Sequence, residues 1–140
     1  MKVVVAKTQK EIIDNMLVRG YVFVVEQKID WEIEYDGLDD QCILFTAYLD
    51  GLAVGAARLY KNKVGRVATL KEYRKQGIAT EIMKEIERYA AESTMPYLKL
   101  HAQLYVKDFY EHLGYTVKGD IFQEAEIDHV LMTKDIILAK

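Results

Sequence analysis

Along the first forty residues, an apolar pattern gives way to an acidic one. A short apolar run over residues 2–6 predicts a first strand. Thr8 and Glu11 then fit the S/T-x-x-E capping box, in which a hydroxyl and a carboxylate satisfy backbone N–H groups at a helix start. The apolar face of this helix is made of Ile12, Ile13, Met16 and Leu17, and the signal continues through Val22, Phe23 and Val24. Gly20 weakens the helix locally, so one bent helix and two short ones both fit the pattern.

Residues 26–40 are the most acidic part of the chain and have no clear period, which predicts a loop with at most a helical turn. Its carboxylates are those of Glu26, Asp30, Glu32, Glu34, Asp36, Asp39 and Asp40. One interpretation is a solvated acidic surface, and the other is a wall of an acceptor-binding site. Arg19 and Arg58 either pair with these carboxylates or bind a carboxylate of a substrate. The excess of acids favours pairing.

The middle of the chain alternates as strands and then becomes helical. Residues 42–49 and 53–60 predict two strands joined by the turn signal Asp50-Gly51, and residues 66–70 predict a third. The helix that follows buries Ile82, Met83, Ile86, Tyr89 and Ala90. Residues 97–102 alternate again as a strand. A strand, a helix and a strand in this order make a crossover, which implies one parallel strand pair.

Two more strands follow a short helix at the end of the chain. The helix covers residues 106–113 and stops at Gly114, and the strands cover 116–122 and 129–136. The whole order predicts an α/β (α+β) fold in a single domain over residues 1–140. Its sheet is mixed and mostly antiparallel, with about seven strands and helices on both faces.

Composition narrows the class of protein. Hydrophobic residues make up 51% of the chain and charged residues 29%, which is ordinary for a globular domain. The net charge of −3 argues against nucleic acid as a partner. A single cysteine without histidine or cysteine neighbours at ligand spacing predicts neither a disulfide nor a metal site. No leader and no apolar run of about 20 residues is visible, so we expect no membrane partner and a cytoplasmic location.

The turn before the central helix has the features of an anion site. Residues 74–79, read RKQGIA, join the third predicted strand of the middle region to the helix. Backbone N–H groups at a helix start bind anions, and Arg74 and Lys75 add positive charge there. Gly77 lets the backbone approach a phosphate closely. The turn lacks both the G-x-x-x-x-G-K-[ST] phosphate loop and the G-x-G-x-x-G fingerprint of dinucleotide-binding domains.

Residues 74–79 resemble the Q/R-x-x-G-x-G/A signature of the GCN5-related N-acetyltransferase (GNAT) superfamily. Residues 109–115, read FYEHLGY, are similar to that family's F/L-Y-x-x-x-G-F/Y segment. Further segments resemble the ElaA/YjcF-like subgroup, namely Arg19, residues 22–27, 34–39 and 57–59, and Ala102-Gln103. The resemblance covers nearly the whole chain and implies the acyl-CoA N-acyltransferase fold, whose parallel strand pair is splayed.

The resemblance also implies a reaction and a set of site residues. The implied reaction is direct transfer of an acetyl group from acetyl-CoA to a primary amine of a small molecule or a protein. Tyr110 would be the general acid that protonates the departing thiolate of coenzyme A. The implied cofactor-binding residues are Ala68, Thr69, Leu70, Arg74, Lys75, Gln76, Gly77, Ile78, Ala79, Thr80 and Gln103. The first three would bind the pantetheine arm through backbone groups, and residues 74–80 would hold the pyrophosphate.

The sequence leaves the general base and the acceptor open. A lysine-like amine has a pKa of about 10.4, so presenting it neutral at pH 7 costs about 4.6 kcal/mol. His101, Glu34, Asp36 and a water relay are all candidates for the base that offsets this cost. A non-catalytic acyl-CoA-binding regulatory module is the alternative to an enzyme. We expect a monomer or a homodimer.

Overall fold

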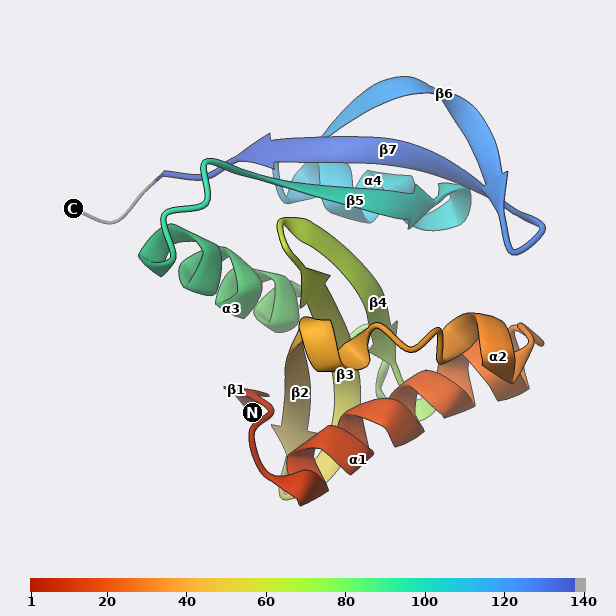
Figure 1. Cartoon of the computed structure of the whole chain (residues 1–140), viewed down its shortest axis with the longest axis vertical. Coiled ribbons are helices and arrows are strands. Elements are labelled where there is room, and N and C mark those ends of the chain that lie inside the picture. The colour runs from red at the N-terminus through yellow and green to blue at the C-terminus, as the bar shows by residue number, and fades with distance from the viewer. Residues whose placement is uncertain (138–140) are drawn as a thin grey trace. The chain divides into compact units, whose positions relative to one another are not determined.

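The computed structural model of the protein describes residues 1–137, which divide into two compact units. Unit 1 comprises Met1–Lys61 and Gly65–Ile86, and unit 2 comprises Asn62–Val64 and the chain from Glu87 onward. In chain order (Figure 1) the elements are β1 (Lys2–Val5), α1 (Gln9–Arg19), the π-helix η1 (Gly20–Glu26), α2 (Trp31–Glu34), the 3₁₀ turn η2 (Asp39–Gln41), β2 (Ile43–Leu49), β3 (Leu52–Tyr60), β4 (Lys63–Thr69), the 3₁₀ turn η3 (Lys71–Tyr73), α3 (Ile78–Glu92), β5 (Tyr97–Gln103), the 3₁₀ turn η4 (Leu104–Val106), α4 (Lys107–His112), β6 (Thr116–Glu124) and β7 (Ile127–Asp135).

Hydrogen bonds connect the strands in the order β1-β2-β3-β4-β5-β7-β6. The pairs β1–β2, β2–β3, β5–β7 and β6–β7 are antiparallel. Strands β4 and β5 are parallel, with Lys63 opposite Lys99 and Val64 opposite Leu100. These pairings confirm the predicted mixed, mostly antiparallel seven-stranded sheet with one parallel pair.

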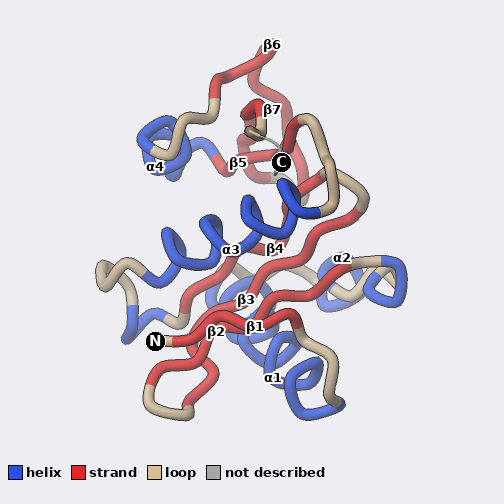
Figure 2. Tube along the Cα trace, turned by 90° about the vertical axis from the view of Figure 1, so that its left-hand side faces the viewer, coloured by secondary structure: helices blue, strands red, loops and turns tan. Residues whose placement is uncertain are grey.

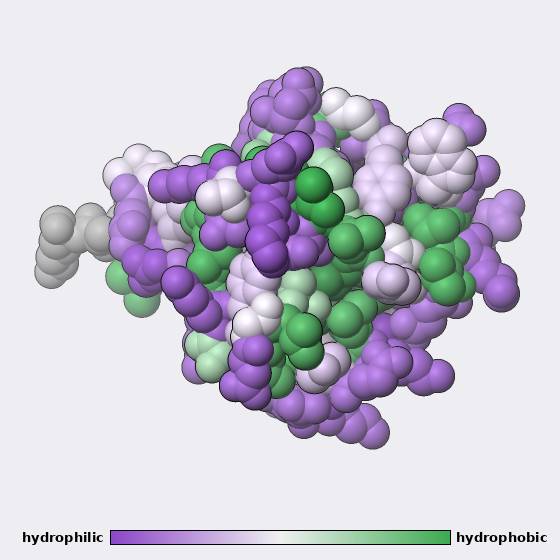
Figure 3. Space-filling view, turned by 90° about the horizontal axis from the view of Figure 1, so that it is seen from below, coloured by the Kyte–Doolittle hydropathy of each residue, from purple (hydrophilic) through white to green (hydrophobic). Residues whose placement is uncertain are grey.

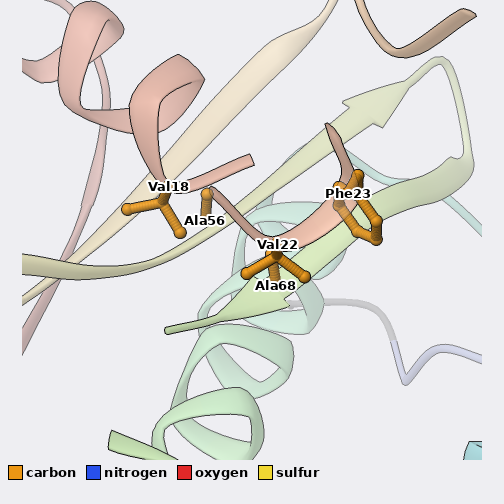
Figure 4. Packing of buried hydrophobic residues seen from close by; sticks show 5 residues of the cluster. All are labelled: Val18, Val22, Phe23, Ala56 and Ala68. Carbon is orange, nitrogen blue, oxygen red and sulfur yellow. The ribbon is translucent and has the colours of Figure 1, made fainter. Parts of the chain in front are cut away.

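In unit 1, helices cover both faces of the sheet (Figure 2). A Cβ atom added to Gly55 of β3 would lie 2.8 Å from the Ile82 side chain of α3, so this glycine permits close packing of α3 on one face. The next residue, Ala56, points to the other face, because successive strand side chains alternate. There a cluster of Val18, Val22, Phe23, Ala56 and Ala68 joins α1 and η1 to β3 and β4 (Figure 4).

The buried face of α1 differs from the predicted one. Thr8 and Glu11 do form the predicted capping box. However, Ile13 and Leu17 are 46% and 53% exposed, whereas Asn15 is completely buried. The Asn15 amide donates to the carbonyl oxygens of Phe45 in β2 (2.8 Å) and Ala57 in β3 (3.1 Å). A polar residue therefore occupies the face toward the sheet, and it satisfies backbone groups of two strands.

The helix does not break at Gly20 but continues as the π-helix η1. Tyr35 explains part of this, because its hydroxyl donates to the carbonyl of Met16, one turn before the glycine. A Cβ atom at position 20 would lie 2.7 Å from that hydroxyl, so a larger residue here would displace the Tyr35 side chain. Along α1 and η1, four large apolar side chains that recur every four residues stay exposed, namely those of Ile13, Leu17, Tyr21 and Val25. Figure 3 shows that hydrophobic residues, in green, reach the surface on the face of the molecule seen from below.

Unit 2 consists of the β5–β7–β6 sheet with α4, the last turns of α3 and the start of β4. Glu87 of α3 accepts from the Tyr115 hydroxyl (3.0 Å) and from Lys134 of β7 (2.9 Å). Lys134 also donates to the Leu113 carbonyl at the end of α4 (2.7 Å). These contacts fix α4 and β7 to the end of α3. Over residues 1–137, no helix is both long and apolar enough for a membrane span.

Candidate functional site

The predicted anion-binding turn lies between β4 and α3, in unit 1. Residues 74–77 follow η3, and α3 begins at Ile78. Lys75 and Gly77 have φ of +65° and +81°, the left-handed region in which glycine is unstrained. A Cβ atom at Gly77 would meet no atom within 4 Å, so the space beside this backbone is open. The first N–H groups of α3 therefore follow an open, basic turn, which is the arrangement that binds phosphate.

Arg74 is held by two partners within unit 1. Its Nε donates to the Thr69 carbonyl at the end of β4 (3.0 Å). Its two terminal nitrogens donate to both carboxylate oxygens of Glu26, each at 2.6 Å. Hydrogen bonds from Arg74 lower the pKa of Glu26 despite the opposing effect of burial. An anion arriving at this turn would meet a carboxylate that already occupies the guanidinium.

The end of β4 supplies the other cofactor-binding residues predicted in unit 1. Ala68 is buried, and the Leu70 N–H donates to the Val54 carbonyl of β3 at 2.9 Å. Thr69 uses its carbonyl to orient Arg74. The Leu70 N–H and the Thr69 carbonyl, which were predicted to bind the ligand, are thus already hydrogen-bonded within the protein.

Arg19 is the centre of an ion-pair network in unit 1. Its side chain is completely buried and donates to Glu34 (2.9 Å), Asp39 (3.0 Å) and the side-chain oxygen of Asn15 (3.1 Å). Arg58 of β3 binds Asp36 through two nitrogens (2.9 and 2.7 Å) and Asp39 through one (3.1 Å). The arginines therefore hold the acidic segment against α1 and β3.

Arg66 completes this network from an unusual backbone position. It lies within β4 with φ of +56°, a conformation that costs a non-glycine residue about 1–2 kcal/mol. Its side chain pairs with Glu34 (3.1 Å) and Asp36 (3.4 Å) and donates to the carbonyl of Ile33 (3.1 Å). These interactions offset the strain and lock α2 to β4.

The network decides between several interpretations of the sequence. Arg19 and Arg58 pair with the acidic segment, as favoured, and Glu34, Asp36 and Asp39 are not merely solvated. The hydrogen bonds from Arg58 hold the pKa of Asp36 well below its usual range, although burial acts in the opposite direction. The pair therefore stabilises the fold above about pH 4, and this stabilisation is lost as the pH falls further. Glu34, buried between two arginines, and Asp36 are thus poor candidates for a general base.

Tyr110 and Gln103 belong to unit 2. Tyr110 lies in α4, buried between the rings of Phe109 and Tyr115, with centroid distances of 5.0 and 5.9 Å. Burial, and to a smaller extent Tyr105, raises the pKa of the Tyr110 hydroxyl, so it stays a phenol throughout the neutral range. Gln103 ends β5 opposite His129 of β7.

His101, the remaining side-chain candidate for the base beside a water relay, has a carboxylate partner in unit 2. Its Nδ1 lies 2.8 Å from Glu124 Oε1 at the end of β6. Glu124 Oε2 also lies 3.9 Å from His129 Nε2. Within residues 1–137 no group of three or more His, Cys, Asp or Glu residues is arranged to hold a metal ion. Cys42 is partly buried, and its thiol donates to the Leu38 carbonyl at 3.2 Å.

The predicted site residues thus form two groups, one in each unit. Unit 1 brings together residues 68–70 and 74–80, and unit 2 carries His101, Gln103 and Tyr110. Sequence reasoning missed Glu26 and Glu124 as partners of site residues. Glu26 lies 48 residues from Arg74 in the sequence, and Glu124 lies 23 residues from His101. A local sequence pattern cannot predict a contact between residues so far apart in the chain.

Comparisons with known proteins agree with this fold. A family model described as an acetyltransferase (GNAT) domain matches residues 17–136. The chain is 35% identical over 140 residues to the uncharacterized N-acetyltransferase YjcF of Bacillus subtilis (strain 168), covering 96% of this chain and 100% of that one. It is also similar to the structure of an acyl-CoA N-acyltransferase from Pseudomonas aeruginosa, with a TM-score of 0.85 and 25% identity over 96% of this chain and 99% of the other. Escherichia coli ElaA shares the fold, with a TM-score of 0.81 and 20% identity over 95% and 97% of the two chains. The chain therefore belongs to the GNAT acetyltransferase family, in its ElaA/YjcF-like group.

Proposed function

We propose that the protein transfers an acetyl group from acetyl-CoA to a primary amine of a small molecule or a protein. The observation that carries this proposal is the strand–turn–helix of β4, η3 and α3, with Arg74, Lys75 and Gly77 at an open helix start. In this proposal, the N–H groups of residues 77–80 and the two basic side chains bind the pyrophosphate of the cofactor. Membership of the GNAT family supports an acyl-CoA donor.

The transfer is direct, without an acetylated enzyme. The neutral amine attacks the thioester carbonyl, a C–N bond forms and the C–S bond breaks. A base takes one proton from the substrate ammonium before the attack, and the nitrogen releases a second proton to solvent as the amide forms. The thiolate of coenzyme A takes a proton from the Tyr110 hydroxyl, which solvent later restores. Gln103, at the end of β5, is assigned to cofactor binding. No metal takes part in this scheme.

Cofactor binding and turnover test the proposal separately. Coenzyme A at about 100 times its Kd should add about 2.7 kcal/mol to the free energy of unfolding, measured by thermal or chemical melts. Acetyl-CoA consumption should then be measured across small amines and lysine-containing peptides. Tight binding without turnover on any amine would indicate a non-catalytic acyl-CoA-binding module. Absence of binding would contradict both functions.

Glu26 gives the cofactor site a sharper test. Replacing Glu26 by Gln should tighten acetyl-CoA binding about fivefold, because the carboxylate competes with the pyrophosphate for Arg74 and repels it. The effect is modest because both side chains are more than a third exposed. Arg74→Gln should weaken binding about tenfold or more. Calorimetric titrations at two salt concentrations would measure both changes.

The matched control is Glu32→Gln, which removes the same charge from an exposed position of the acidic segment. It should leave the Kd within about twofold. Weaker binding by Glu26→Gln would show that the carboxylate instead positions Arg74 for the cofactor.

A further inference from the structure

One face of the unit 2 sheet gathers a carboxylate, two imidazoles and an aromatic ring. Cross-strand pairing places Gln103 opposite His129 and His129 opposite Phe122. His101 lies two residues before Gln103 in β5, and Glu124 lies two residues after Phe122 in β6. Side chains two residues apart share a face, so all five lie on the same side of the sheet. The Phe122 ring packs edge-on against His101 and stacks on His129, with centroid distances of 5.0 and 6.0 Å. These three strands thus fix the two imidazoles around Glu124.

The hydrogen bonds assign the protons on both rings. His129 Nδ1 lies 2.7 Å from the Ile127 carbonyl, which only accepts, so Nδ1 carries the proton. Burial raises the pKa of Glu124, but the hydrogen bond from His101 and the charges of His101, Lys63 and His129 together lower it below its usual value. An ionised carboxylate only accepts, so His101 also carries its proton on Nδ1. In the neutral ring, Nε2 of His101 is then a proton acceptor.

We propose that His101 is the general base of the transfer and that Glu124 is its positioning residue. This inference rests on the proposed N-acetyltransferase function and names the base of that reaction. Nε2 of His101 takes one proton from the substrate ammonium, leaving the neutral amine that attacks the thioester. The nitrogen's second proton leaves to solvent as the amide forms, and the thiolate takes the Tyr110 proton. The cycle releases one proton, once solvent has restored both residues.

Glu124 suits this role because it holds the ring and favours its charged form. A carboxylate that accepts from Nδ1 fixes the tautomer and stabilises the imidazolium formed when Nε2 takes a proton. Of the other charged groups on this side of unit 2, His129 when protonated, Lys63, Lys99 and Lys118 are cations, and Asp135, at the far end of β7, is an anion. The cations oppose a positive charge on the His101 ring, and the carboxylate beside the ring balances them.

Steady-state kinetics over pH 5.5–9 would test the base. His101→Gln should lower kcat/KM about 100-fold without changing the Kd of acetyl-CoA. Glu124→Gln should move the rising limb of the pH–rate profile and reduce kcat, and Glu124→Asp should restore part of kcat. His112→Gln, in an exposed position of α4, should behave as the wild type. Thermal melts of each variant would establish that it is folded.

The outcomes separate the two proposals. If the wild type acetylates amines and His101→Gln does so at the same rate with the same pH profile, the base role is wrong while the function stands. If the wild type binds acetyl-CoA but acetylates no amine, the function fails and the base role fails with it. Imidazole NMR titration adds a readout independent of turnover. In the wild type His101 should carry its proton on Nδ1, and in Glu124→Gln, whose amide can also donate, both ring tautomers should be populated. An unchanged tautomer would overturn the positioning role of Glu124.

Discussion

Replacing Tyr110 by Phe should lower kcat about 100-fold to 1000-fold while the Kd of acetyl-CoA stays within about twofold. The hydroxyl is the proposed donor to the departing thiolate, and without it the C–S bond must break toward an unprotonated leaving group. The ring itself remains, so packing against Phe109 and Tyr115 is kept. Single-turnover rates with saturating acetyl-CoA would isolate this step.

Two controls distinguish chemistry from packing in this experiment. Tyr115→Phe removes a hydroxyl from the same aromatic cluster, where it donates to Glu87 at 3.0 Å. It should cost about 1–2 kcal/mol of stability and leave kcat within about twofold. Thioesters of more acidic thiols should shrink the penalty of Tyr110→Phe, because such thiolates leave without a proton. A penalty that is equal for both tyrosines, or independent of the leaving group, would contradict the acid role.

The protonation of the Tyr110 hydroxyl also predicts how the rate depends on pH. Because burial raises the pKa of Tyr110, the proposed acid stays protonated up to and beyond pH 10. The rate should therefore show no fall between pH 7 and pH 9 from loss of the acid.

The sequence was sufficient to predict those helices, turns and caps that are determined by their own residues. The capping box at Thr8 forms as predicted. Of the five predicted inward positions of α3, Ile82, Met83, Ile86 and Ala90 are completely buried, because a 3.6-residue period indicates which side faces the sheet. Tyr89, the fifth, is only partly buried. The turn proposed to bind the cofactor is equally local, since its glycine, its basic residues and the helix start are contiguous.

Prediction failed where a distant residue decides the local structure. The Tyr35 hydroxyl that packs against Gly20 and bonds to the Met16 carbonyl comes from outside the helix, so the periodicity of residues 9–24 cannot predict it. The burial of Glu34 depends on Arg19 and Arg66, which reach it from α1 and β4. For the same reason the His101–Glu124 pair depends on strand register, which shifts between Lys118 and Phe122 of β6. Side-chain pairs that are distant in the sequence can be identified only from the folded structure.

Arg19 is the residue whose loss should cost the most stability. Arg19→Met should lower the free energy of unfolding by about 3–5 kcal/mol, because it removes a completely buried cation. Glu34 would remain almost fully buried with Arg66 as its cation, and Asp39 would depend on Arg58 alone. The midpoint of thermal unfolding should fall by roughly 10 °C.

Arg88→Met is the matched control for this substitution. It removes an ion pair of 3.1 Å with Glu92 in which both side chains are about 60% exposed. Solvent screens this pair, so its loss should change stability by less than about 0.5 kcal/mol. If Arg19→Met were as mild as the control, burial of the arginine would not govern its contribution, and the acidic segment would be held chiefly by Arg58 and Arg66. A large loss confined to Arg19→Met would instead show that α1 organises the segment, since the guanidinium is the link between this helix and residues 34 and 39.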